Sequence, residues 1–134
     1  MHFFISFKAL ENDVCLPFHY NHIVQSLIYN SIEPELASFL HEKGFVHQKR
    51  LFKLFSFSNL RGRYAIDRER GLICFQEKVD LVVSSPVEEF CQSLVNTLLT
   101  KNTVRIGAAD VQVEKIFVNK YPVPGENISI YTLS

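Results

Sequence analysis

The pattern of apolar and polar positions predicts a strand and two helices in the first third of the chain. Residues 3–8 are apolar almost throughout, which favours a short central strand. From Asn21, a residue type that favours the N-cap, apolar residues recur at the spacing of one helical face. Pro34 suits the first turn of a second, shorter helix, and Gly44 suits its end. His41 then falls in the last turn of that helix.

The same reasoning predicts two strands and a long helix in the middle of the chain. Residues 51–58 and 72–79 have strand character and are joined by a polar, glycine-containing connection. We therefore expect a long hairpin with a basic tip. Ser85, Pro86 and Glu88 fit a capping box with proline at the first helical position. The apolar face of this helix consists of Val87, Phe90, Cys91, Leu94, Val95, Leu98 and Leu99.

A further strand region over residues 111–118 completes the order strand, helix, strand, strand, helix, strand. This order predicts an α+β protein with the ferredoxin-like βαββαβ fold, an antiparallel sheet with helices on one face. We expect residues 1–120 to form that domain. Residues 121–134 are rich in turn residues and then strand-like, so we expect a linker and the first strand of a second ferredoxin-like domain.

Composition fits one folded domain in a reducing compartment. The chain has 134 residues, of which 47% are hydrophobic, enough for a packed core without metal or disulfide staples. Cys15, Cys74 and Cys91 lie in or beside apolar runs, so we expect buried, reduced thiols and a cytoplasmic location. The sequence has no basic leader and no apolar run of membrane-spanning length, so we expect no membrane insertion.

Positive charge is concentrated in one segment although the whole chain is neutral. Residues 41–70 carry eight Lys and Arg against three Asp and Glu, a net charge of +5. Basic residues beside an aromatic strand suit contacts with RNA phosphates next to stacked bases. The candidates for these contacts are Lys49, Arg50, Arg61, Arg63 and Arg68. Two alternatives stay open, a solvated basic loop and salt bridges to the acidic residues within the segment.

Three side chains could share the cleavage of an RNA phosphodiester. Without a metal, that reaction needs a base for the 2′-hydroxyl, an acid for the leaving oxygen and a cation at the phosphorane. His41 at a helix C-terminus is favoured as imidazolium, although it could be an ordinary surface histidine. Lys53 lies in an aromatic strand, where it could instead be an edge lysine that reaches water. Tyr29 lies beside an apolar helical stripe and could equally be a core tyrosine.

Metal and cofactor motifs were weighed and set aside. Cys15, His19 and His22 have a spacing that could hold zinc, but no fourth ligand lies nearby in sequence. The chain has no glycine-rich nucleotide loop and no nucleophile elbow. We therefore expect no metal and no cofactor.

Three stretches together resemble the N-terminal half of a known family. They are "LPFHYNHIVQSLIYN" from Leu16, "FLHEKGF" from Phe39 and "FKLFSFSNL" from Phe52. They look like the sixth family of CRISPR-associated proteins, endoribonucleases of the RAMP superfamily that cut precursor CRISPR RNA within each repeat. The likeness continues through "VEEFCQSLVNTLL" and "VRIGAADVQVEKI".

The resemblance implies two tandem ferredoxin-like domains and metal-independent cleavage that leaves a 2′,3′-cyclic phosphate and a 5′-hydroxyl. By motif match, it implies an active site of Tyr29, His41 and Lys53. It also implies CRISPR repeat RNA as a partner, together with a second ferredoxin-like domain, a second copy or other CRISPR-associated subunits. Two alternatives stay open: a non-catalytic RNA-binding or scaffold subunit on the same fold, and a small assembly domain whose open sheet pairs with a second copy.

Overall fold

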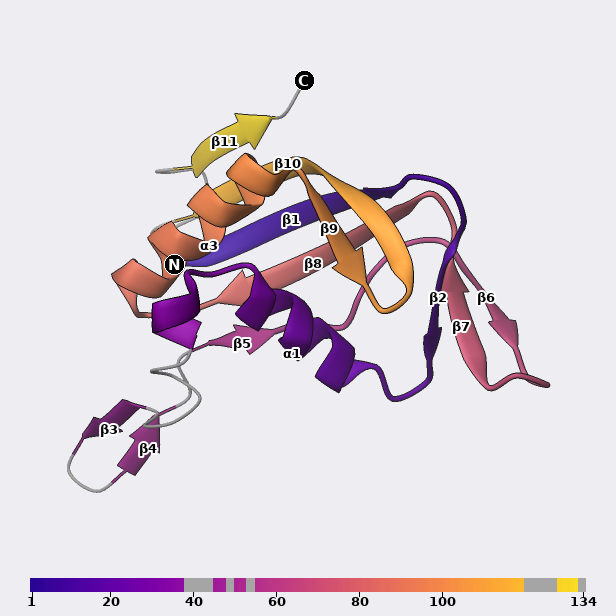
Figure 1. Ribbon diagram of the computed structural model, residues 1–134, viewed down its shortest axis with the longest axis horizontal. Helices are drawn as coiled ribbons and strands as arrows, with labels where there is room; N and C mark the ends of the chain where they lie inside the picture. The colour runs from indigo at the N-terminus through magenta and orange to yellow at the C-terminus, as the bar shows by residue number, and fades with distance from the viewer. Residues whose placement is uncertain (38–44, 48–49, 53–54, 120–127, 133–134) are drawn as a thin grey trace.

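The main sheet has the ferredoxin-like strand order. The computed structural model describes residues 1–37, 45–47, 50–52, 55–119 and 128–132 (Figure 1). Its main antiparallel sheet has the order β11-β10-β1-β8-β5, with β9 paired to β10. These strands are β1 (His2–Ala9), β5 (Ser56–Phe57), β8 (Lys78–Ser84), β9 (Thr103–Ile106), β10 (Ala109–Asn119) and β11 (Ile128–Thr132). The central order β10-β1-β8-β5 confirms the predicted α+β, ferredoxin-like class.

Two helices cover one face of this sheet (Figure 1). They are α1 (Asn21–Asn30) and α3 (Glu88–Lys101). Alternate side chains of β1, namely Phe3, Ile5 and Phe7, are buried with the apolar faces of both helices in one core. The predicted helical faces are confirmed, because local periodicity depends only on neighbouring residues.

The predicted helix starts were wrong by one or two residues. Asn21 is the first residue of α1 rather than its cap, which is Tyr20. α3 begins at Glu88, so Pro86 precedes the helix. The Ser85 Oγ accepts a hydrogen bond from the backbone N–H of Val87 at 3.1 Å, a turn before the helix instead of a capping box. Residues 34–37 are helical as predicted, and the expected end at Gly44 lies outside the described residues.

The predicted long hairpin is confirmed, with different strand limits. Its ladder runs from Ser56 opposite Ser84 to Asp67 opposite Leu72, and its tip is the turn at residues 68–71. The strand predicted at residues 72–79 is divided into two strands around Glu77, whose φ is +56°. A Cβ at Gly62 would collide with the carbonyl oxygen of Lys78, so this close approach of the two arms requires glycine.

The outer part of the hairpin belongs to a separate three-stranded sheet. Its order is β2-β7-β6. The strands are β2 (Val14–Pro17), β6 (Tyr64–Asp67) and β7 (Leu72–Phe75). Neither β2 nor β6 was predicted as a strand, because β2 is only four residues long and β6 lies within the polar connection of the hairpin. A short antiparallel pair, β3 (Phe45–His47) and β4 (Arg50–Phe52), lies apart from both sheets (Figure 1).

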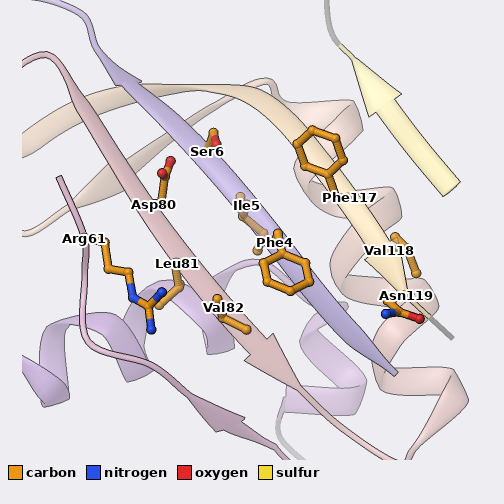
Figure 2. Close-up of a pocket in the computed structure, with 10 residues that line it drawn as sticks. All are labelled: Phe4, Ile5, Ser6, Arg61, Asp80, Leu81, Val82, Phe117, Val118 and Asn119. Carbon is orange, nitrogen blue, oxygen red and sulfur yellow. The ribbon is translucent and has the colours of Figure 1, made fainter. Parts of the chain in front are cut away.

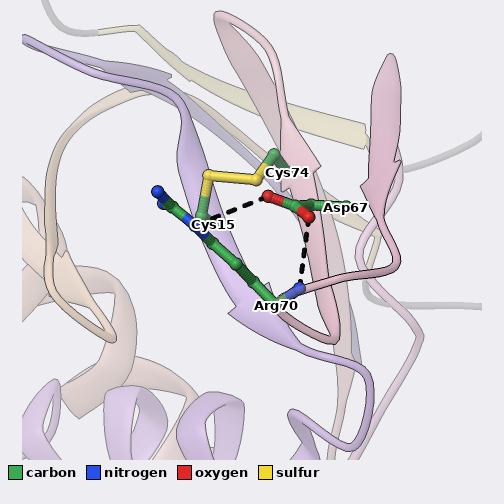
Figure 3. Close-up of polar contacts among 4 residues, drawn as sticks. All are labelled: Cys15, Asp67, Arg70 and Cys74. Carbon is green, nitrogen blue, oxygen red and sulfur yellow. Dashed lines mark hydrogen bonds and ion pairs between the residues drawn. A yellow bond between two sulfur atoms is a disulfide. The ribbon is translucent and has the colours of Figure 1, made fainter.

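Two of the three cysteines contradict the prediction of reduced thiols. Cys15 on β2 and Cys74 on β7 are directly opposite in the ladder and form a disulfide (Figure 3). Their Cα atoms are 3.9 Å apart. A sequence separation of 59 residues hides this pairing, and only the strand register brings the thiols together. Cys91 is free and buried, as predicted, and burial raises the pKa of its thiol.

The last described strand adds to the main sheet. β11 pairs antiparallel with β10, with Tyr131 opposite Ile116. The division of the chain after residue 120 into two domains stays a prediction. Among the described helices, none combines the length and apolar character that a membrane crossing needs.

Candidate functional site

Tyr29 is placed by aromatic packing at the end of α1. Its ring meets the ring of Phe55 edge to face, with the centroids 5.6 Å apart. Phe55 is stacked in turn on Phe90 of α3, with centroids 5.0 Å apart and planes 3° from parallel. This aromatic cluster of Tyr29, Phe55 and Phe90 ties the segment just before β5 to both helices.

Lys53 is near this cluster in sequence. Lys53 precedes Phe55 by two residues and itself lies outside the described part of the chain. The position of Lys53 relative to Tyr29 therefore stays a prediction.

The helix expected to carry His41 is anchored in the same region. The backbone N–H of Glu33, just before the helical residues 34–37, donates to Ser93 Oγ on α3 at 2.8 Å. His41 and Lys49 both lie outside the described residues.

A second tyrosine, Tyr20, is a buried core residue whose hydroxyl is hydrogen-bonded. The Tyr20 hydroxyl accepts a hydrogen bond from the backbone N–H of Leu60 at 3.0 Å, and the residue is only 8% exposed. Tyr29 is half-buried, and among the described residues none hydrogen-bonds its hydroxyl. The core-tyrosine alternative therefore fits Tyr20 better than Tyr29.

The predicted RNA-binding arginines are spread along the hairpin rather than gathered at Tyr29. Arg61 follows β5, Arg63 precedes β6, and Arg68 lies in the turn at the tip, all three exposed. In Figure 1 the tip lies at the right end of the molecule, beyond β2, whereas the C-terminal end of α1 lies well to the left of it. Arg50 is on β4, opposite His47.

The salt-bridge alternative holds for one arginine of the segment. Arg70 Nε is 3.7 Å from Asp67 Oδ2, with the Arg70 side chain 77% exposed and the Asp67 side chain 40% exposed (Figure 3). Within the described part of the chain, no carboxylate lies at ion-pair distance from Arg61, Arg63 or Arg68. These three guanidinium groups are therefore available to an anionic partner.

Arg61 borders a hollow on the helix-free face of the main sheet. Its volume is about 530 Å³. Phe4 lies at its centre, directly opposite Phe117 on one neighbouring strand and Val82 on the other (Figure 2). Phe4 is 45% exposed. An aromatic floor beside an unpaired guanidinium suits a ligand with flat rings and phosphates.

The sequence analysis missed one polar cluster near this aromatic packing. His2 Nδ1 is 2.6 Å from Ser84 Oγ. Both residues line a pocket of about 390 Å³ together with Phe55 and Ser56. No signal in the sequence pairs positions 2 and 84; only the register of β1 with β8 does so.

Metal ligands do not gather in the described structure. Among those residues, no three His, Cys, Asp or Glu side chains are placed to hold an ion. Cys15, which was weighed as a zinc ligand, is bonded to Cys74. His19 and His22 are exposed.

Fold and site together define a class of protein: a ferredoxin-like domain with an aromatic open face and a basic hairpin. Residues 15–117 match the family model described as "CRISPR-associated protein Cas6, N-terminal". The chain belongs to this family, which confirms the resemblance found in the sequence.

A curated relative agrees with this assignment. The chain is 32% identical over 127 residues to "CRISPR-associated endoribonuclease Cas6 1" of Methanocaldococcus jannaschii. The match covers 92% of this chain and 47% of the relative, so the chain spans about half the length of that protein.

Solved structures share the fold. One titled "CRISPR associated protein Cas6" has a TM-score of 0.60 at 24% identity, covering all of this chain and 62% of its own. One titled "Characterization of a Cas6-related gene from Pyrococcus furiosus" has a TM-score of 0.66 at 20% identity, covering 99% of this chain and 61% of its own. A third structure, titled "An RAMP protein binding different RNA substrates", has a TM-score of 0.65 at 20% identity. The match covers 100% of this chain and 62% of that protein's chain.

Proposed function

We propose that this chain is a metal-independent endoribonuclease, or the N-terminal domain of one, that cleaves precursor CRISPR RNA within the repeat. The products would be a 2′,3′-cyclic phosphate and a 5′-hydroxyl. Family membership supports the reaction class. The single structural observation that supports the site is the contact of Tyr29 with Phe55, two residues from Lys53. We expect the protein to act in the cytoplasm.

Each proposed active-site residue has one role. Tyr29 orients or deprotonates the 2′-hydroxyl, which attacks the adjacent phosphorus. His41 transfers a proton at that hydroxyl or at the 5′ leaving oxygen. Lys53 stabilises the negative charge that develops on the phosphorane oxygens. No bond in this scheme requires an ion or a cofactor.

RNA binding is proposed to use the open face and the hairpin. Arg61 would contact a phosphate while bases stack on Phe4 and Phe117, which Figure 2 shows on the same face. Arg63 and Arg68 would extend the phosphate contacts along the hairpin, and Lys49 and Arg50 would add to them. A second ferredoxin-like domain, a second copy or other CRISPR-associated subunits would complete the RNA site.

One observation favours a second candidate, a non-catalytic RNA-binding or scaffold subunit. The chain is neutral overall, whereas phosphate contacts usually require an excess of basic residues. In this case the same arginines would hold RNA, and Tyr29, His41 and Lys53 would have no part in cleavage.

The test is incubation of the protein with end-labelled repeat RNA in EDTA. A single cut within the repeat, with a cyclic phosphate end detected by mass spectrometry, supports the endoribonuclease. His41→Ala should then reduce the cleavage rate by about 10²-fold or more while RNA affinity changes little. Retention without cutting supports the second candidate, and cleavage only after addition of a divalent ion contradicts the proposed mechanism.

A further inference from the structure

β6 is an edge strand with apolar side chains in water. Among the described strands it pairs with β7 only. Tyr64 is 57% exposed and Ile66 is 51% exposed, and Ala65 between them is also exposed. Edge strands of soluble proteins usually carry lysine, proline or a bulge that prevents further pairing. β6 has none of these, whereas β2 at the other edge of the sheet ends with Pro17.

The free hydrogen-bonding groups of β6 belong to Tyr64 and Ile66. The backbone carbonyl of Arg63 accepts a hydrogen bond from the backbone N–H of Gln76 at 2.8 Å. The backbone N–H and C=O groups of Arg63 therefore point toward the β7 side. Successive residues of a strand direct their backbone groups to opposite sides. Ala65 and Asp67 therefore also face β7. The N–H and C=O groups of Tyr64 and Ile66 point away from the sheet.

We propose that β6 pairs antiparallel with β6 of a second copy of this chain, with a twofold axis at Ala65. In this register Tyr64 lies opposite Ile66 of the partner subunit. The outward backbone groups of both residues then form hydrogen-bonded pairs on each side of the axis. Two apolar pairs that are half exposed in one subunit cover each other in the dimer.

Apolar and charge complementarity together favour this partner and this register. The same alignment places Arg63 opposite Asp67 of the partner subunit, and the symmetry gives this pair twice. Arg63 has no ion-pair partner among the described residues. Asp67 accepts a hydrogen bond from the backbone N–H of Arg70 at 3.2 Å, and its ion pair with Arg70 is long at 3.7 Å. The neighbouring registers allowed by the outward groups place Tyr64 opposite Tyr64, or Ile66 opposite Ile66, of the partner subunit. The first of these places Ile66 opposite Gly62 of the partner subunit, and the second places Tyr64 opposite Arg68 of the partner subunit, so neither forms the two apolar pairs.

Arg63 is also among the proposed RNA contacts, but the dimer is predicted and measured without RNA, so the inference does not depend on the proposed function. The sheet that contains β6 is also held by the Cys15–Cys74 disulfide across β2 and β7 (Figure 3). β6 therefore pairs with a strand, β7, that is covalently bonded to β2. Because the contact is small, we expect a weak dimer that dissociates on dilution.

Charge reversal gives a decisive test by native mass spectrometry and sedimentation equilibrium at high-micromolar protein. Wild type should be dimeric. Arg63→Glu and Asp67→Arg should each raise the dimer dissociation constant at least about tenfold, because each places two like-charge pairs at the axis. An equimolar mixture of the two variants should give heterodimers, because each reversed charge then meets its opposite.

Controls separate this interface from general effects. Arg105→Glu disrupts another exposed ion pair, that of Arg105 Nε with Asp110 Oδ1 at 3.3 Å, and should leave the dimer intact. Arg70→Ala removes the side-chain ion pair of Asp67 and should also leave the dimer intact. Circular dichroism checks that each variant is folded. A wild type that stays monomeric, or two variants that remain dimeric alone or fail to form heterodimers when mixed, would overturn the proposal.

Discussion

The Tyr29 ring meets the Phe55 ring edge to face, at 5.6 Å between centroids and 73° between planes. This contact joins the end of α1 to Phe55, just before β5. It leaves the Tyr29 hydroxyl without a hydrogen-bond partner among the described residues. A side chain held by its ring and free at its hydroxyl is suited to act on a bound substrate.

Tyr29→Phe should separate catalysis from packing. The substitution keeps the ring contact with Phe55 and removes only the hydroxyl, so we expect a cleavage rate lower by about 10²-fold or more with RNA affinity nearly unchanged. Tyr20→Phe is the matched control. It removes a buried hydrogen bond to Leu60 and should cost about 1 kcal/mol of stability while leaving cleavage intact. Equal cleavage by wild type and Tyr29→Phe would exclude Tyr29 from the mechanism.

Phe55→Ala should reduce both stability and cleavage. The ring bridges Tyr29 and Phe90, so its loss opens a cavity and frees the adjoining segment. We expect a decrease of about 2–3 kcal/mol in the free energy of unfolding by urea, below the range for fully buried phenylalanines. Phe57→Ala removes a neighbouring half-buried ring and should destabilise the fold with a smaller effect on cleavage. If both variants cleave equally well, the aromatic cluster does not position the site.

Arg61→Ala combined with Arg68→Ala should change the salt dependence of RNA binding. Each lost phosphate contact on single-stranded RNA should lower the slope of log affinity against log salt by about 0.7. The double variant should therefore lose about 1.4. Arg105→Ala serves as the control, because that guanidinium is engaged by Asp110. Fluorescence anisotropy at several salt concentrations measures the slope, and an unchanged slope would place the RNA elsewhere.

Reduction of the disulfide should destabilise the fold. The Cys15–Cys74 bridge closes a loop across a separation of 59 residues, for which chain entropy predicts a loss of up to about 4 kcal/mol. Dithiothreitol should thus lower the unfolding midpoint of wild type but not of the Cys15→Ser, Cys74→Ser double variant. After reduction, Cys15 and Cys74 should react with a thiol reagent at neutral pH. Cys91 should react only on unfolding, because burial raises the pKa of its thiol and blocks access.

The hairpin shows how far sequence reasoning reached. Its existence and basic tip were predicted, yet β6 was taken for a charged connection because Arg63, Asp67 and Arg68 surround only a few apolar residues. An exposed edge strand lacks the alternation that marks a half-buried one. Its strand character comes from backbone pairing with β7, which the pattern of side chains does not record.

For the candidate site too, the sequence identified the residues but not the contacts between them. Tyr29, His41 and Lys53 were identified by resemblance and by chemistry, and α1 was predicted by its own periodicity. The approach of Tyr29 to Phe55 and the pairing of His2 with Ser84 join residues 26 and 82 positions apart. No local pattern encodes such contacts.

The sequence by itself determined the helices, the order of elements and the family, because these depend on neighbouring residues and on short motifs. Tertiary structure decided the disulfide, the second sheet, the open aromatic face and the free edge of β6. Each of these requires the register between strands that are distant along the chain, and that register is set by the packing of the whole core.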